Sequence, residues 1–551
     1  MARRALALAA LAACAAACLA WWWQRGQLVS PVDAPPGRIA CASYAPYRLP
    51  GQSPFVPGIR IRAPQIRADL ELLAKRARCV RTYSVSHGLA EVPRIARSLG
   101  LEVLLGVWIG RDERANEREL ALAIDVANRA PEAVRAVIVG NEVLLRREQP
   151  PARLRAMIER VRAAVPQPVT YADVWEFWLR HRELAQSVSF VTVHVLPYWE
   201  DDPVPVERAV GHLTHVHGEV RAAFPGQPIL IGETGWPSAG RSRAGAVPGR
   251  VNQARFVREF LVAAGARGID YNLIEAFDQP WKRGLEGTVG GHWGLLGAEG
   301  EAKFPLRGPL AEDPEWRRGW TVAAVLAGLM ALAAGTGLLP FVRRRPGAAA
   351  IAAAGLAGAA SGGVLCAQLS FLAQSSRTAL EWTVGGLLTA AAGVAAILAG
   401  AAIAGAIDAP AAGADAPGPL RPAAEVVRAR AAPGDAAAWL ALARFVILFA
   451  AAAQCLMLVF DARYRDFPLA LFAVPAAGFA LLALVSRAHR RAGTEERLLA
   501  AVIVAAAPLI AVEETAANAH ALAWCGLCLL LGGAVLGPWL VGGRSRERER
   551  A

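Results

Sequence analysis

The pattern of hydrophobic and polar positions divides the chain into two kinds of sequence. From about residue 30 to residue 310, short apolar runs alternate with charged segments, whereas residues 320 to 542 consist mainly of long runs of Ala, Leu, Gly and Val. Runs of the second kind are longer and more apolar than most folds in water can bury. We therefore expect a water-soluble domain followed by a group of membrane-spanning helices.

Eight apolar, β-branched runs recur in the first region, and such runs are typical of buried parallel strands. Segments with helical spacing of their apolar residues lie between them, including residues 112–129, 151–165 and 251–266. Eight strand–helix units in about 280 residues predict a closed (β/α)₈ or TIM barrel. A doubly wound open sheet is the alternative, but no Gly-x-Gly-x-x-Gly turn follows the first strand. The expected strands lie near residues 39–44, 79–84, 101–109, 134–141, 168–174, 189–196, 227–233 and 269–277.

Membrane-spanning helices are expected at eight places. The first is at residues 5–23, and the other seven lie near 320–342, 348–373, 381–407, 439–460, 467–486, 497–513 and 519–542. The fold class is therefore α/β, a TIM barrel followed by an all-α transmembrane region. Its expected parts are an N-terminal anchor helix at 1–29, the barrel at 30–310, and a seven-helix region with a basic cytoplasmic tail at 311–551.

The N-terminal apolar run has two interpretations. Leu11-Ala-Ala-Cys14 is similar to a lipoprotein cleavage site, and a cleaved signal peptide is also compatible with the sequence. The apolar run nevertheless continues through Cys14 to Trp21-Trp22-Trp23, and aromatic residues are common where a spanning helix meets lipid headgroups. We favour an uncleaved anchor.

The formal net charge of +13 could indicate a nucleic-acid-binding protein, so the positions of the basic residues matter. One alternate set of short loops and termini holds sixteen arginines, and the opposite set holds only Arg377, Arg463 and Arg465. This asymmetry follows the positive-inside rule, with both termini in the cytoplasm and residues 24–318 in the periplasm or outside the cell. We expect a lipid bilayer as partner and no nucleic acid. The sixteen are Arg3, Arg4, Arg343, Arg344, Arg345, Arg421, Arg428, Arg430, Arg487, Arg490, Arg491, Arg497, Arg544, Arg546, Arg548 and Arg550.

Six of the eight cysteines lie inside expected spans, where the pair Cys525 and Cys528 suggests small apolar packing and not a metal or redox site. Cys41 and Cys79 fall near the starts of the first two expected strands, which are neighbours in a barrel. A disulfide between them is compatible with an oxidising compartment, although only the geometry can decide it.

The strongest chemical signals are two strand ends. Val137-Ile-Val-Gly-Asn-Glu142 and Ile229-Leu-Ile-Gly-Glu-Thr-Gly-Trp-Pro-Ser238 each place a glutamate where a buried strand should reach the rim. From the fourth and seventh strands, Glu142 and Glu233 can face each other across the barrel mouth, about 5 to 5.5 Å apart in a retaining glycosidase. Mutual repulsion should then raise the pKa of Glu142, making it the acid/base, with Glu233 as the charged nucleophile.

Six motifs then resemble the family 17 glycoside hydrolases, the β-1,3-glucanases and glucanosyltransferases. The resemblance implies a retaining (β/α)₈ enzyme of a membrane-bound bacterial type, with Asn141 contacting the sugar 2-hydroxyl. It does not extend to the seven C-terminal spans, and Gln279 stands where members commonly carry an acidic residue. The motifs are Val-Arg-Thr-Tyr-Ser (80–84), Leu-Leu-Gly-Val-Trp (104–108), Val-Gly-Asn-Glu-Val-Leu (139–144), Gly-Glu-Thr-Gly-Trp-Pro-Ser (232–238), Glu-Ala-Phe-Asp-Gln-Pro-Trp-Lys (275–282) and His-Trp-Gly-Leu (292–295).

Further polar and aromatic residues near the strand ends are candidates for substrate binding. Their rings suit stacking on pyranose faces, although a single Trp is more often core, and placement favours Trp236 and Trp281. Glu275 and Lys282 are expected either to bond sugar hydroxyls or to form a rim salt bridge. The candidates beside Glu142, Glu233 and Asn141 are Tyr83, His194, Tyr198, Trp199, Trp236, Glu275, Trp281, Lys282 and Trp293.

Two clusters are discounted, and neither a metal nor a cofactor is expected. His212-x-x-His215-x-His217 divides its side chains between helix faces, and Asp201-Asp202 lies in a Pro-rich loop with no phosphate cradle.

Two functions follow from the sequence. The first is a membrane-tethered β-glucan hydrolase or transglycosylase, with the choice of water or sugar as acceptor left open. The second is a glucan-export or docking protein whose barrel only binds sugar. The C-terminal helices suggest an anchor and docking surface, for which a glucan synthase is a candidate partner, and residues 409–433 suggest a flexible cytoplasmic loop.

Overall fold

The computed structural model describes residues 2–409, 422–429, 432, 434–486 and 492–548, with side chains to residue 537 in the last helix. Most of the loop predicted at 409–433 and the end of the basic tail lie outside the described residues. The chain divides into two compact units, Leu28–Leu310 on the one hand and Met1–Gln27 with Ala311–Ala551 on the other.

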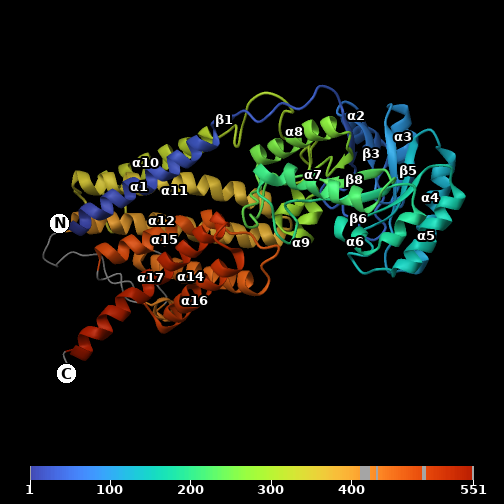
Figure 1. Cartoon of the computed structure of the whole chain (residues 1–551). Helices are drawn as coiled ribbons and strands as arrows, with labels where there is room; N and C mark the ends of the chain where they lie inside the picture. The colour runs from blue at the N-terminus through green and yellow to red at the C-terminus, as the bar shows by residue number, and fades with distance from the viewer. Residues whose placement is uncertain (1, 410–421, 430–431, 433, 487–491, 549–551) are drawn as a thin grey trace. The chain divides into compact units, whose positions relative to one another are not determined.

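The first unit contains a closed barrel of parallel strands, with neighbours in the order β2 to β9 (Figure 1). The pairing of Ala42 with Leu273 joins the last strand to the first, which confirms the barrel and excludes the open doubly wound sheet. The strands are β2 (Ile39–Ser43), β3 (Ala77–Arg81), β4 (Glu102–Val107), β5 (Val134–Asn141), β6 (Val169–Val174), β7 (Val191–His194), β8 (Ile229–Thr234) and β9 (Asp270–Leu273). A separate two-stranded sheet is formed by β1 (Leu28–Val29) and β10 (Leu310–Ala311).

Helices follow the strands, as the apolar spacing predicts. In α4, the Asp112 side chain caps the first turn by accepting from the amides of Arg114 and Ala115, and Leu120 and Ala123 face the core. The α-helices of this unit are α2 (Ala63–Ala74), α3 (Val92–Ser98), α4 (Glu113–Arg129), α5 (Pro151–Ala164), α6 (Trp175–Arg180), α7 (Val206–Ala223), α8 (Arg250–Arg267) and α9 (Arg283–Glu286). Its 3₁₀ helices are η1 (Leu89–Glu91), η2 (Arg182–Ser187), η3 (Pro280–Lys282) and η4 (Thr288–Gly291).

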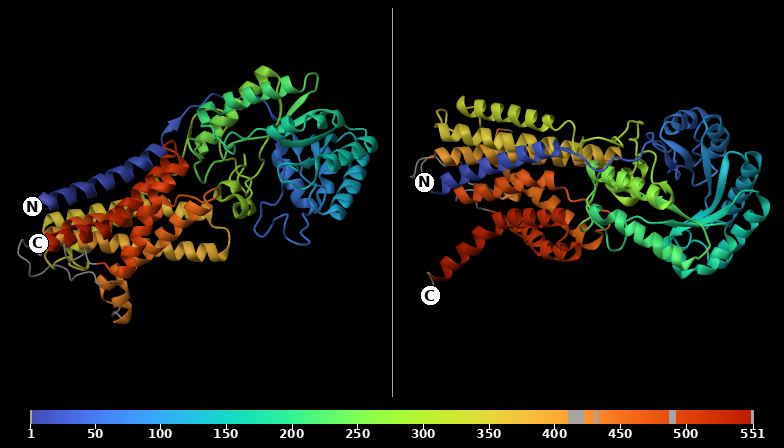
Figure 2. Two further views of the ribbon diagram at one scale, coloured as in Figure 1. Left: turned by 60° about the horizontal axis from the view of Figure 1, so that its bottom comes forward. Right: turned by 45° about the horizontal axis from the view of Figure 1, so that its top comes forward.

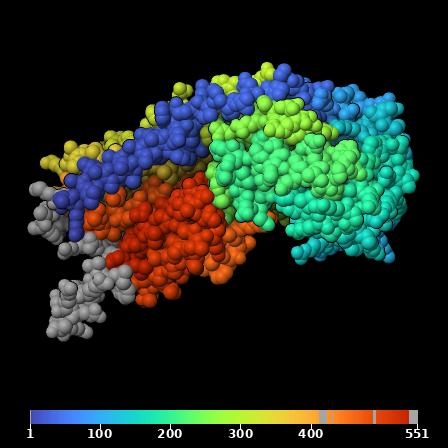
Figure 3. Space-filling view, in the orientation of Figure 1, coloured from blue at the N-terminus to red at the C-terminus, as the bar shows by residue number. Residues whose placement is uncertain are grey.

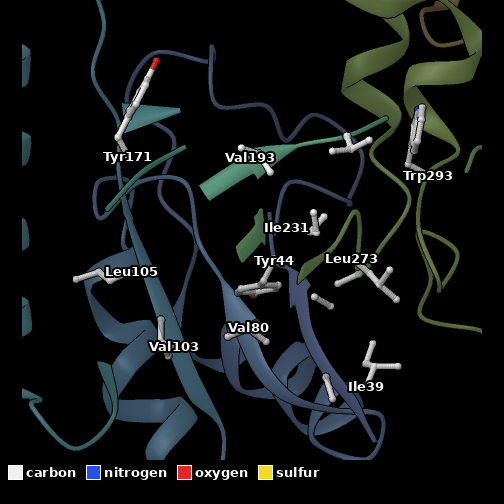
Figure 4. Packing of buried hydrophobic residues seen from close by; sticks show 14 of the residues in the cluster. Ile39, Tyr44, Val80, Val103, Leu105, Tyr171, Val193, Ile231, Leu273 and Trp293 are labelled. Carbon is white, nitrogen blue, oxygen red and sulfur yellow. The ribbon is translucent and has the colours of Figure 1, made fainter. Parts of the chain in front are cut away.

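The strand residues are buried on both faces because helices cover the outside of the barrel. Val80, Val103, Val193 and Ile231 are at most 1% exposed and belong to one continuous core (Figure 4). Because every neighbouring pair of strands in the barrel is parallel, the carboxyl ends of all eight gather at a single rim.

Cys41 and Cys79 are register partners on β2 and β3, and their sulfur atoms form a disulfide. Adjacent parallel strands bring the two side chains close enough for the bond. The geometry therefore supports the disulfide that the sequence alone left open.

The second unit is helical. α1 (Ala2–Arg25) lies on its outside in Figure 3, and α10, α11 and α12 lie side by side in Figures 1 and 2. Gly358 and Gly362 on α11 permit close packing, because an added Cβ would come within 2.6 Å of a backbone oxygen of α10. The remaining helices are α10 (Arg317–Gly335), α11 (Ala348–Ser375), α12 (Ala379–Asp408), α13 (Ala423–Arg428), α14 (Ala436–Phe460), α15 (Leu469–Val485), α16 (Thr494–Glu514) and α17 (Ala519–Arg548).

Among the described residues, six helices are long and apolar enough to cross a membrane, where the sequence predicted eight spans. The two others are α15 and α16. With 17 residues, α15 is about 25 Å long, short of a bilayer core of about 30 Å. The first turn of α16 contains the charged residues Glu495, Glu496 and Arg497, and Glu496 forms a buried ion pair with Arg444 of α14.

Candidate active site

The structure brings Glu142 and Glu233 together at the carboxyl-end rim. One carboxylate oxygen of each, with a ring nitrogen of His194, forms a group whose atoms all lie within 4.8 Å of one another. Glu142 follows β5 directly, while Glu233 lies near the end of β8. The turn that presents Glu142 is left-handed, with φ of 87° at Gly140 and 54° at Glu142. Positive φ is uncommon for a glutamate and often marks a functional position.

Arg81 and Tyr83 hold the Glu233 carboxylate. Arg81 Nη1 donates to Glu233 Oε1 at 3.1 Å and to the Gly232 carbonyl at 2.7 Å, and the Tyr83 hydroxyl donates to Glu233 Oε1 at 2.9 Å. The second Arg81 nitrogen donates to the Asn141 side-chain oxygen. Two donors, one of them cationic, hold this carboxylate oxygen in place.

Arg81 was not among the candidate residues of the sequence, although it lies in a quoted motif. The signal was a charged residue inside the apolar run that forms β3, where it is 1% exposed. A charge in such a place needs a partner, and here its partners are the two strand ends that carry the carboxylates.

His194 lies between the two glutamates. Its Nδ1 is 2.9 Å from Glu142 Oε1, and its Nε2 is 3.7 Å from Glu233 Oε1 and 3.4 Å from Arg81 Nη1. Because a carboxylate only accepts hydrogen bonds, Nδ1 is the donor in the contact with Glu142. The His194 side chain is only 1% exposed, so it contacts the two carboxylates and offers little surface to a ligand. The sequence had suggested a direct contact with the substrate instead.

The electrostatics of Glu142 correct one expectation. Burial raises its pKa, but the hydrogen bond and charge of His194, with the charges of Arg146 and Arg81, outweigh burial, so the net pKa lies below its ordinary value. The sequence argument considered only repulsion between two carboxylates and therefore predicted a raised pKa. It could not include cations that other strands bring to the same place.

The barrel domain is similar in sequence to known proteins. Residues 41–294 match the model of the BtgE/BtgC glycoside hydrolase domain. The barrel domain is therefore similar to the family 17 glycoside hydrolases. A glucan 1,3-beta-glucosidase of Schizosaccharomyces pombe is 29% identical over 260 residues, 43% of this chain and 79% of that protein. One of Candida albicans is 24% identical over 265 residues, 43% of this chain and 84% of that protein. The crystal structure of a glycoside hydrolase family 17 beta-1,3-glucanosyltransferase from Rhizomucor miehei is 25% identical and covers 49% of this chain and 98% of that chain, with a TM-score of 0.43.

The aromatic candidates of this glycoside hydrolase domain fall into two groups. Tyr198 and Trp236 are 0% exposed and Trp293 is 2% exposed, so their rings pack inside the rim and offer little surface to a sugar. Trp199 and Trp281 are partly exposed, and each rests on another aromatic ring, at 6.4 Å from Trp293 and 5.7 Å from Phe55. The preference for Trp236 therefore fails on burial, whereas Trp281 keeps part of its surface.

Gln279 has a structural role that explains its departure from the family pattern. Its Nε2 donates to the Ala45 carbonyl at 2.6 Å, and its Oε1 accepts from Trp281 Nε1 at 2.8 Å. A carboxylate could not make the first of these bonds. In this chain, the amide fixes Trp281 and is itself fully buried.

Glu275 and Lys282 form a buried pair, not the exposed rim salt bridge considered from the sequence. Lys282 Nζ is 3.0 Å from Glu275 Oε1, and the Glu275 side chain is 0% exposed. Burial raises the pKa of Glu275 from 4.5 to about 7, with Lys282 opposing the shift, and neighbouring carboxylates raise the pKa of Lys282 despite its burial.

This shift predicts a pH dependence of stability. Between pH 4.5 and 7 the folded chain binds a proton at Glu275 that the unfolded chain releases, so the free energy of unfolding should fall by about 3 kcal/mol as the pH rises through this window. The unfolding midpoint of the full chain, followed by fluorescence from pH 4 to 8, measures it. Glu275→Gln should flatten the slope, and an unchanged slope would contradict the assignment.

Glu142, His194 and Glu233 also form the one group among the described residues whose spacing could hold a metal ion. The Arg81 guanidinium contacts Glu233 and approaches His194, so it already supplies positive charge where a cation would bind. The donor set therefore suits carboxylate chemistry better than metal binding. On α7, His212 lies 3.4 Å from Glu200 and His215 lies 3.5 Å from Glu219.

Proposed function

We propose that the barrel is a retaining glycosidase or transglycosylase that acts on β-1,3-glucan. The observation that carries the proposal is the approach of the Glu142 and Glu233 oxygens to within 4.8 Å. An inverting enzyme needs about 6.5 to 9.5 Å to place water between its carboxylates, so this spacing favours a covalent intermediate. The similarity to the glucan 1,3-beta-glucosidases of Schizosaccharomyces pombe and Candida albicans supports the substrate class.

In the first step, Glu233 attacks the anomeric carbon while Glu142 gives a proton to the departing glycosidic oxygen. The bond to the leaving sugar breaks as the glycosyl ester forms. In the second step, Glu142 takes a proton from water or a sugar hydroxyl, whose oxygen displaces Glu233. Loss of the Glu233 charge in the ester removes a like charge beside Glu142 and lowers its pKa, so Glu142 stays ionised after the first step and can accept that proton.

The lowered pKa of Glu142 in the ligand-free chain is compatible with its role as acid if one proton is shared with His194. The 2.9 Å contact between Nδ1 and Oε1 allows an imidazolium–carboxylate pair to become a neutral pair by one proton transfer. Sugar binding removes water from the cleft, which disfavours the separated charges and favours the proton on Glu142.

Product analysis tests the proposal. The purified full chain should cleave laminari-oligosaccharides with retention of the β-anomer, as seen by NMR at early times, while β-1,4-linked oligosaccharides serve as the linkage control. Products longer than the substrate indicate transfer, and only shorter ones indicate hydrolysis. Early α-anomer would refute the retaining mechanism.

We further infer that the enzyme is bound to the cytoplasmic membrane with its barrel in the periplasm and both termini inside. Six apolar helices, the arginines of the N-terminus, of residues 343–345 and 421–430 and of the C-terminal tail, and the Cys41–Cys79 disulfide support this placement. Protease added to spheroplasts should remove the barrel and spare both termini. A glucan synthase is the partner that this location favours, and co-purification from membranes would detect it.

A further inference from the structure

Trp108 is an exposed ring at the rim that the proposed mechanism does not use. It follows β4 directly, one strand away from the β5 end that carries Glu142, and is 39% exposed. The Arg146 guanidinium lies over the ring at 4.2 Å from its centroid. One face is therefore covered by a cation, and the exposed surface belongs to the remainder of the ring.

The backbone that carries the Trp108 ring is held by a buried carboxylate. The Trp108 amide donates to Glu119 Oε1 at 3.4 Å, and the same buried carboxylate oxygen accepts from Ser84 Oγ at 2.6 Å and the Val85 amide at 2.8 Å. Glu119 thus joins the loops after β3 and β4. A Trp108 side chain on a backbone held in this way loses little conformational entropy when a ligand binds.

Hydrogen bonds also hold the Arg146 guanidinium in place, and one of them reaches the turn that carries Glu142. Its Nη2 donates to Glu148 at 2.8 Å and to the Ile109 carbonyl at 3.1 Å, and its Nη1 donates to the carbonyl of Asn141, the residue before Glu142. The bond to Asn141 restrains the left-handed turn that presents Glu142. One guanidinium therefore supports both the aromatic ring and the carboxylate.

Given the proposed function, we propose that Trp108 forms an additional sugar-binding subsite, stacking on the apolar face of a pyranose ring one or more units from the cleaved bond. Arg146 is a positioning residue for this ring and for Glu142. An aromatic face and the C–H face of an all-equatorial sugar are complementary in shape and polarity. The cation behind the ring adds to its rigidity and not to sugar contact.

Removal of Trp108 should matter more as the substrate grows longer. Trp108→Ala is expected to raise KM for laminarihexaose about tenfold, with a smaller effect for laminaritriose, and Trp108→Phe should recover most of the loss. Leu145→Ala is the matched control, since Leu145 is 41% exposed on the same rim and has no ring. Equal KM values for Trp108→Ala and the wild type at every chain length would overturn the subsite.

Arg146 has a different expected signature. The charged or titratable groups around Glu142 are His194, Arg81, Glu233, Asp173, Glu286 and Arg146 itself. Arg146 lowers the pKa of Glu142, so Arg146→Met should move the alkaline limb of the kcat profile to higher pH, by up to about one unit, whereas Arg146→Lys should move it less. An unmoved limb in Arg146→Met would overturn the positioning role.

Binding separates failure of the subsite from failure of the proposed function. Calorimetry with laminarihexaose on Glu233→Gln and on Glu233→Gln/Trp108→Ala reports the subsite without any turnover. About tenfold weaker binding by the double variant supports the subsite even if the reaction differs from the proposed one. Equal binding by the two variants, beside an active wild type, refutes the subsite and leaves the proposed function standing.

Discussion

Glu233→Gln is expected to lower kcat on laminari-oligosaccharides by at least about 10⁴-fold while sparing the fold. The amide keeps the shape of the side chain but is a poor nucleophile, and no other described carboxylate shares the contacts of Glu233 with both Arg81 and Tyr83. Initial rates on the purified full chain, with the unfolding midpoint measured in parallel, provide the test.

The matched control is Glu132→Gln. Glu132 is 60% exposed and pairs only with the exposed Arg97 among the described contacts, so its loss should change the rate little. A second variant, Glu233→Ala, should recover turnover of an activated aryl β-glucoside with azide and give the α-glycosyl azide, because azide then attacks from the vacated face. Normal turnover by Glu233→Gln would remove Glu233 from the mechanism, and intact cellular function in that variant would favour a barrel that only binds sugar.

The second large effect is expected at Arg81. Arg81→Met should reduce kcat/KM by about 10² to 10³-fold, because Glu233 loses its cation and the Asn141 oxygen loses its donor. It should also lower the free energy of unfolding by about 3 to 5 kcal/mol, since a buried carboxylate loses its charged partner. Enzyme kinetics and thermal unfolding of the full chain measure the two effects.

Arg81→Lys distinguishes charge from geometry. Lysine returns a positive charge near Glu233 but cannot also reach the Gly232 and Asn141 oxygens in the arginine geometry, so we expect stability to recover more than kcat/KM. If Arg81→Met retained both activity and stability, the proposed link between β3, β5 and β8 would be wrong.

The sequence by itself determined the barrel and the pair of glutamates. Apolar β-branched runs at regular spacing specify buried parallel strands, and the strand bounds agree with the expected ones to within a few residues, as at 134–141 for β5. Glutamate is costly inside a strand, so Glu142 and Glu233 mark the places where strands end. Both signals are local, and a local pattern is what a sequence shows directly.

Only the tertiary structure decided the surroundings of those glutamates. Arg81 and His194 come from strands far from Glu142 in the sequence, and the pKa of Glu142 falls because both of them, with the nearby Arg146, converge on it. Burial also decided between similar aromatics, since Trp236 is enclosed whereas Trp108 remains exposed. These properties depend on distances across the barrel, where residues far apart in sequence become neighbours, so no local pattern could predict them.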